Sequence, residues 1–121
     1  MPAPVRISIL IFTVLLSAQA AAGEKLDDTI SYLLNYVATS KVTFIRNGVS
    51  HTPAEAVAHI KAKYDHFKSE IKTPEDFIRL SASKSLQTGK PYLVRTPEGK
   101  EMHLDAWLTD ALNAHRAQTA Q

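Results

Sequence analysis

The sequence contains no cysteine among its 121 residues. This absence excludes disulfide bonds as a source of stability, and it also excludes a lipid anchor attached to a cysteine. A chain of this length is typical of a single domain, and about a hundred residues can build a modest hydrophobic core without cross-links. The fold therefore has to be held together by side-chain packing and hydrogen bonds.

The sequence also lacks a hydrophobic run long enough for a membrane helix, which needs ~20 apolar residues. The apolar stretch near the start, Ile7–Leu16, is much shorter. It follows Met1–Arg6, which contributes a single positive charge, and it precedes the small residues of Ser17–Gly23. This order of a charged start, an apolar middle and a small-residue exit is typical of a secretory signal peptide.

Two positions satisfy the small-residue rule of the signal peptidase, and cleavage is expected after Ala20 or after Ala22. We therefore expect residues 1–22 to be a signal peptide and residues 23–121 to form a single globular domain. The exported domain is expected to be soluble, with no stable membrane insertion after cleavage.

An excess of charge of one sign is lacking as well. Without Arg6, the 14 basic residues become 13 against 12 acidic residues, a formal charge of +1. Proteins that bind nucleic acids normally carry a concentrated basic surface, so we expect no nucleic-acid partner. Several lysines alternate with acidic residues, and we interpret them as a solvated helix face: Lys61, Lys63, Lys68 and Lys72.

Apolar residues at helical spacing predict four helices. They cover about Glu24–Ala38, a segment that begins at Pro53, about Pro74–Ala82 and about Leu104–Ala117. Thr52 and Glu55 have the spacing of a capping box, and Pro53 suits the first position of the helix. Thr73 and Asp76 repeat this pattern at the start of the third helix, with the shorter Asp as a weaker partner.

Short strand-like segments lie between these helices. Val42–Arg46 and Val49–His51 flank Asn47-Gly48, a strong signal for a two-residue hairpin turn. Pro91–Arg95 and Glu101–His103 flank a second turn. The sequence therefore predicts an α+β fold that is mainly α, with about four helices and one or two short β-hairpins.

Three residues in the middle of the chain recur at the spacing of metal ligands. His51, Glu55 and His59 are each four residues apart, which is about one turn of a helix. Histidine and carboxylate groups at this spacing can hold a metal ion. The pattern differs from H-E-x-x-H, however, and the capping box already explains Glu55. We therefore expect no metal site and no cofactor.

A serine hydrolase is a second possibility, because Ser50 neighbours His51 and further serines lie in the segment 81–89. A serine nucleophile needs a base within hydrogen-bonding reach and a third group that orients the base. The sequence has no G-x-S-x-G motif and no complete phosphate-binding loop. We therefore expect no catalytic residues.

A polar cluster at the hairpin remains a candidate binding surface. Its members are Arg46, Asn47, His51, Glu55 and His59, to which Ser83, Ser85 and Tyr92 of the later loop are added. Arg46 would anchor a carboxylate or phosphate through its planar fork of donors. The alternative is an ion pair between Arg46 and Glu55 that joins the hairpin to the helix.

Three blocks of the sequence carry a resemblance to a known family. They are F-x-R-N-G-x-x-H-T-x-x-E-A-x-x-H at 44–59, T-x-E-x-F-I at 73–78 and A-S-x-S-x-x-T-G-K-P-Y-x-V at 82–94. The series resembles a family of small exported bacterial proteins, domain of unknown function 5329. The resemblance implies a Gram-negative periplasmic location but no activity, cofactor or partner. Pro53 stands where a relative has cysteine, so a thiol role cannot be general in the family.

These observations favour a binding or protein-interaction module of the periplasm without catalytic activity. Its partner would be a periplasmic protein or a small anionic ligand. The alternative is a small hydrolase of the cell envelope that uses His51 or His59 as its base, with or without a metal ion.

Overall fold

The computed structural model describes residues 24–120, so the predicted signal peptide lies outside the described residues. The described chain forms, in order, α2 (Leu26–Thr39), β1 (Thr43–Arg46), β2 (Val49–His51), α3 (Pro53–Phe67), the short 3₁₀ helix η1 (Lys68–Glu70), α4 (Pro74–Ser81), β3 (Leu93–Arg95), β4 (Glu101–His103) and α5 (Leu104–Thr119). The fold is α+β and mainly α, which confirms the class that the sequence predicts.

The two predicted capping boxes fix where α3 and α4 begin. Thr52 Oγ1 accepts a hydrogen bond from the Glu55 amide at 3.2 Å, and Glu55 Oε1 accepts one from the Thr52 amide at 2.9 Å. Thr73 and Asp76 make the same reciprocal pair, at 3.1 and 3.2 Å. These bonds satisfy amide groups that have no partner inside a helix.

Two hairpins combine into one antiparallel sheet of four strands, in the order β2-β1-β3-β4. Asn47 and Gly48 turn the first hairpin with φ values of 52° and 79°, as a type I′ turn requires. The sequence predicts both hairpins but not their union, which rests on the pairing of Phe44 in β1 with Val94 in β3.

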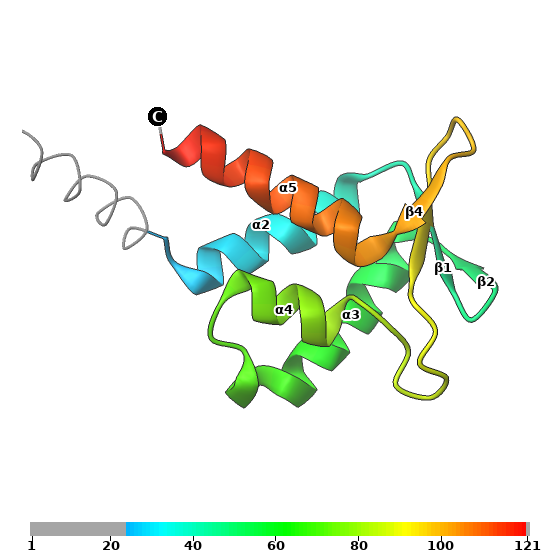
Figure 1. The fold of residues 1–121 in the computed structure, drawn as a ribbon, viewed down its shortest axis with the longest axis horizontal. Coiled ribbons are helices and arrows are strands. Elements are labelled where there is room, and N and C mark those ends of the chain that lie inside the picture. Colours follow the sequence, from blue (N-terminus) through cyan, green and yellow to red (C-terminus); the bar gives the residue numbers. More distant parts are fainter. Residues whose placement is uncertain (1–23, 121) are drawn as a thin grey trace, which may run out of the picture.

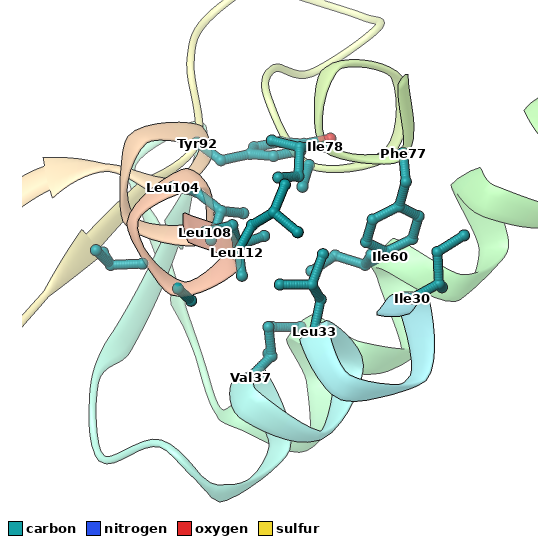
Figure 2. Packing of buried hydrophobic residues seen from close by; sticks show 14 of the residues in the cluster. Ile30, Leu33, Val37, Ile60, Phe77, Ile78, Tyr92, Leu104, Leu108 and Leu112 are labelled. Carbon is teal, nitrogen blue, oxygen red and sulfur yellow. The ribbon is translucent and has the colours of Figure 1, made fainter. Parts of the chain in front are cut away.

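The four helices pack against one another, and the sheet lies at one end of the bundle (Figure 1). Helices supply most of the core, and Figure 2 shows their buried side chains converging. The sheet adds Phe44 and Val94, which pair across β1 and β3 and are both buried. Within residues 24–120, no helix has both the length and the apolar character needed to cross a membrane.

An arginine joins three helices at the end of the bundle away from the sheet. Arg116 of α5 donates to Glu24, just before α2, with distances of 2.6 and 2.9 Å. It also donates to Glu75 of α4, at 2.6 and 3.2 Å. Both carboxylates raise the pKa of Arg116, chiefly through these hydrogen bonds. The guanidinium is therefore a fully paired, structural cation.

Candidate functional site: a basic pocket between the hairpin and α3

A pocket of about 200 Å³ opens where the first hairpin meets α3. Most of its wall is apolar, from Phe44, Ile45, Ala56, Ile60, Leu93 and Leu104. Its polar lining comes from Arg46, His51, Glu55, His59 and Tyr92. All five of these polar residues are among the candidates that the sequence singles out.

Strand and helix periodicity bring these polar groups together. Arg46 ends β1 two residues after Phe44, so both side chains leave the same face of the sheet. Glu55 and His59 lie one turn apart on α3. Tyr92 directly precedes β3, whose pairing with β1 places it near the same face.

A continuous contact network runs from the hairpin through α3 to Tyr92. The Nη1 atom of Arg46 lies 3.0 Å from His59 Nδ1 and 3.2 Å from His59 Nε2. His59 Nε2 lies 2.8 Å from Tyr92 Oη. Behind them, Lys63 Nζ donates to Tyr92 Oη at 3.2 Å and to the Lys84 carbonyl at 2.7 Å.

The interpretation of Lys63 as part of a solvated face is wrong, because its side chain is only 7% exposed. Ala56, Ile60 and Lys63 are four and three residues apart, so Lys63 continues the buried face of α3. Its long aliphatic stem packs in the interior while the ammonium group reaches polar partners. That spacing is the signal in the sequence for Lys63, which the predicted cluster leaves out.

The tautomer of His59 decides the direction of the hydrogen bonds in this network. Arg46 can only donate, so the His59 nitrogen that it contacts must carry a lone pair, and Nδ1 at 3.0 Å is the nearer of the two. In the neutral tautomer that accepts from Arg46 at Nδ1, Nε2 carries the proton and donates to Tyr92 Oη. In this tautomer Oη accepts from both His59 and Lys63, so the Tyr92 hydroxyl proton is left to donate elsewhere.

The charges in the network are all of one sign. Burial lowers the pKa of His59, and the positive charges of Arg46 and Lys63 lower it further. Burial likewise lowers the pKa of Lys63, with Arg46 adding to the effect. Burial raises the pKa of Tyr92, so its phenol stays protonated. At neutral pH, neutral His59 and Tyr92 therefore lie between two cations.

The predicted ion pair between Arg46 and Glu55 is not formed. Glu55 Oε1 instead binds the Thr52 amide and lies 3.6 Å from His51 Nδ1. The capping role holds Glu55 at the rim of the pocket, and its side chain is 60% exposed. Across residues 24–120, neither Arg46 nor Lys63 makes a salt bridge with a carboxylate.

Asn47 and Ser85 lie beside the pocket rather than in it. Asn47 Nδ2 donates to Ser85 Oγ at 3.3 Å, and Asn47 Oδ1 accepts from Thr88 Oγ1 at 2.6 Å. These bonds tie the hairpin turn to the loop before β3, and Ser85 is buried. Ser83 is not brought into the cluster, because its hydroxyl donates to the Arg79 carbonyl at 2.6 Å.

The histidines have few of the partners that hydrolysis requires. His51 has the Glu55 carboxylate, and His59 has Arg46 and Tyr92. In the described part of the chain, neither histidine bonds to a serine hydroxyl. No three His, Cys, Asp or Glu side chains of these residues converge in the manner of metal ligands.

A family model described as a family of unknown function (DUF5329) matches residues 24–116, a range that includes every residue of the pocket. The chain belongs to this family. The resemblance seen in the sequence is therefore confirmed.

A relative in Salmonella typhimurium (strain LT2), the uncharacterized protein YfeK, is 45% identical over 64 residues. The aligned part is 52% of this chain and 53% of YfeK, so the match spans about half of the relative's length. No solved structure matches the chain significantly.

Proposed function

We propose that the protein is an exported, non-catalytic binding module of the periplasm, and that its ligand is a small anion held in the basic pocket. Export is supported by the signal-peptide pattern of residues 1–22 and by the family resemblance. Binding is supported by two cations: Arg46 lines the pocket, and Lys63 lies behind its wall and donates to the lining residue Tyr92.

The missing counter-charge is the observation that carries the proposal. A buried cation is costly unless it is paired, and Lys63 is almost fully buried. No described carboxylate pairs with Lys63 or Arg46, and residues 1–23 contain neither Asp nor Glu. A bound anion would supply the charge that the chain does not provide.

Arg46 also has donors to spare. Its guanidinium carries five N–H groups, and its described side-chain partners are His59, through Nη1, and Tyr92. The rest of the fork is suited to two parallel bonds with a carboxylate or phosphate. The hydroxyl proton of Tyr92 adds a third donor at the same wall of the pocket.

The hydrolase alternative has less support. His51 has an orienting carboxylate in Glu55, but a general base acts on a nucleophile or a water within hydrogen-bonding reach. His59 instead contacts a cation, Arg46, and the phenol of Tyr92, and this environment suits the binding of an anion better than the removal of a proton.

The proposal is tested by titrating the purified protein with small anions and following the His59 and Tyr92 signals by NMR. Acetate, hexanoate, phosphate and hexyl phosphate are the probes, and hexylamine is the cationic control. We expect anions alone to shift these signals. We expect Arg46→Gln to weaken the binding by at least ~10-fold, because a charge-assisted pair is lost.

Arg95→Gln is the matched control. Arg95 lies in β3, pairs with the exposed Glu101 at 2.6 Å and does not line the pocket. Its replacement should leave the affinity unchanged. If no anion shifts His59 or Tyr92, or if Arg46→Gln binds as tightly as the wild type, the pocket is not an anion site and the proposal fails.

A further inference from the structure

We infer, on the basis of the proposed function, that the ligand is a monocarboxylate with a compact apolar body of about six to eight carbons. Its carboxylate would meet Arg46 and Tyr92, and its body would fill the space between β1 and α3. Three features of the pocket support this choice of ligand: its size, its apolar wall and its distribution of charge.

The size of the pocket limits the body of the ligand. An apolar cavity of about 150 Å³ holds one benzene molecule. A pocket of about 200 Å³ therefore has room for a slightly larger body. A bare inorganic ion would leave most of this space empty.

The lining explains why the body should be apolar. Six of the eleven residues that line the pocket are apolar, and they come from the sheet, from α3 and from the first residue of α5. Contact with such a wall is favourable for carbon and unfavourable for polar groups that find no partner there. A ligand with hydroxyl groups along its body would lose hydrogen bonds to water without replacing them.

The rim explains why the head should carry a single charge. Glu55 lines the same pocket, and its pKa is lowered, chiefly by the hydrogen bond from the Thr52 amide. Its negative charge therefore persists at neutral pH and repels a second negative charge on a ligand. A carboxylate matches the fork of Arg46 and carries one charge, whereas a phosphate monoester approaches two.

The inference is tested by a chain-length series of acetate, butanoate, hexanoate, octanoate and dodecanoate, titrated into the wild-type protein by calorimetry or NMR. Each added CH₂ should tighten binding by up to ~4-fold until the pocket is full, at about six to eight carbons. Longer acids should gain no further affinity. Hexyl phosphate should bind at least ~10-fold more weakly than hexanoate.

The outcomes separate this inference from the proposed function. If acetate binds as tightly as hexanoate, or if hexyl phosphate binds more tightly, the monocarboxylate with an apolar body is wrong although the anion site stands. If no anion binds at all, the proposed function fails and the inference fails with it.

A pair of variants localises the body of the ligand. Ala56→Leu adds bulk to the wall of the pocket, whereas Ala58→Leu adds the same bulk to the exposed face of α3. Ala56→Leu should move the point where affinity levels off to shorter acids, and Ala58→Leu should leave it unchanged. If both variants fold and their affinities level off at the same chain length, the body of the ligand lies elsewhere. If Ala56→Leu does not fold, the wild-type series still decides.

Discussion

The two half-buried arginines of this fold have opposite surroundings. Arg116, at the helical end, makes four hydrogen bonds to Glu24 and Glu75. Arg46, at the sheet end, has a neutral histidine and the Tyr92 phenol as its described side-chain partners and a buried lysine nearby. The carboxylates raise the pKa of Arg116, whereas burial, and after it the charge of Arg46, lowers the pKa values of His59 and Lys63.

This difference distinguishes a structural cation from an available one. An arginine with four of its five donors occupied by carboxylates stabilises the fold and has little left to offer a ligand. An arginine among other bases contributes repulsion in the free protein, and an anion relieves that repulsion on binding. The two ends of the molecule therefore predict opposite results when each arginine is removed.

The largest difference is expected in stability. Arg116→Gln should lower the free energy of unfolding by about 2 kcal/mol, because it breaks two bidentate pairs that join three helices. Arg46→Gln should change it by less than about 0.5 kcal/mol, because the lost contact with His59 is offset by relieved repulsion. Urea denaturation of both variants measures the difference.

When ligand is added, Arg46 rather than Arg116 should decide how much the protein is stabilised. Hexanoate should raise the midpoint of the wild type and of Arg116→Gln but not that of Arg46→Gln, because only a protein that binds the ligand is stabilised by it. A cost of several kcal/mol for Arg46→Gln without ligand would make Arg46 a structural group and end the contrast.

A smaller effect is expected at the turn beside the pocket. Asn47 sits at φ 52° and also ties the turn to Ser85 and Thr88. Asn47→Ala should cost about 1 kcal/mol more than Asn47→Gly, because alanine resists positive φ and glycine does not. Thermal or urea unfolding of the two variants checks this value.

The glycine variant isolates the tether itself. Asn47→Gly keeps the turn but loses both side-chain bonds, so the amide of Gly89, which donates to the Ser85 carbonyl, should exchange faster with solvent. Salt should not change this effect, since the tether is uncharged, whereas it should weaken the Arg116 cluster. Unchanged exchange in Asn47→Gly would show that the loop holds its place without the tether.

Local sequence patterns predicted much of the fold, because the interactions that set them are local. The capping boxes of α3 and α4 involve residues three apart, and the Asn47-Gly48 turn depends on its own backbone angles. The union of the hairpins was not predicted. Phe44 and Val94 are far apart in sequence, and no local pattern in either strand indicates which strand it pairs with.

The sequence predicted most of the residues of the candidate site but not the contacts among them. Arg46, His59 and Tyr92 do lie together, but Arg46 meets His59 rather than Glu55. Opposite charge alone suggested the wrong pair, because the capping bonds already held Glu55 at the rim. Lys63 was misread because lysine is usually exposed, although its spacing on α3 placed it on the buried face.

The smallest effect is expected with pH, and it sharpens the contrast between the two ends. The pKa of His59 is lower in the folded protein than its ordinary value of about 6.5, because of burial and the charges of Arg46, Lys63 and His51. The unfolded chain therefore binds more protons in this window. Stability should fall as the pH drops from about 6.5 through the lowered pKa, and it should not fall further below that pKa on account of His59.

His59→Gln is the variant that isolates this term, since glutamine can still accept from Arg46 and donate to Tyr92. Thermal unfolding from pH ~8 to ~5 should show a shallower loss of stability in the variant than in the wild type.

Saturating hexanoate should reduce the loss in the wild type, because an anion beside His59 raises its pKa. The carboxylates around Arg116 titrate well below this range, since Arg116 lowers the pKa values of Glu24 and Glu75. Identical pH profiles for wild type and His59→Gln would mean that the charges of Arg46 and Lys63 do not lower the pKa of His59. The electrostatic basis for the anion site would then fail.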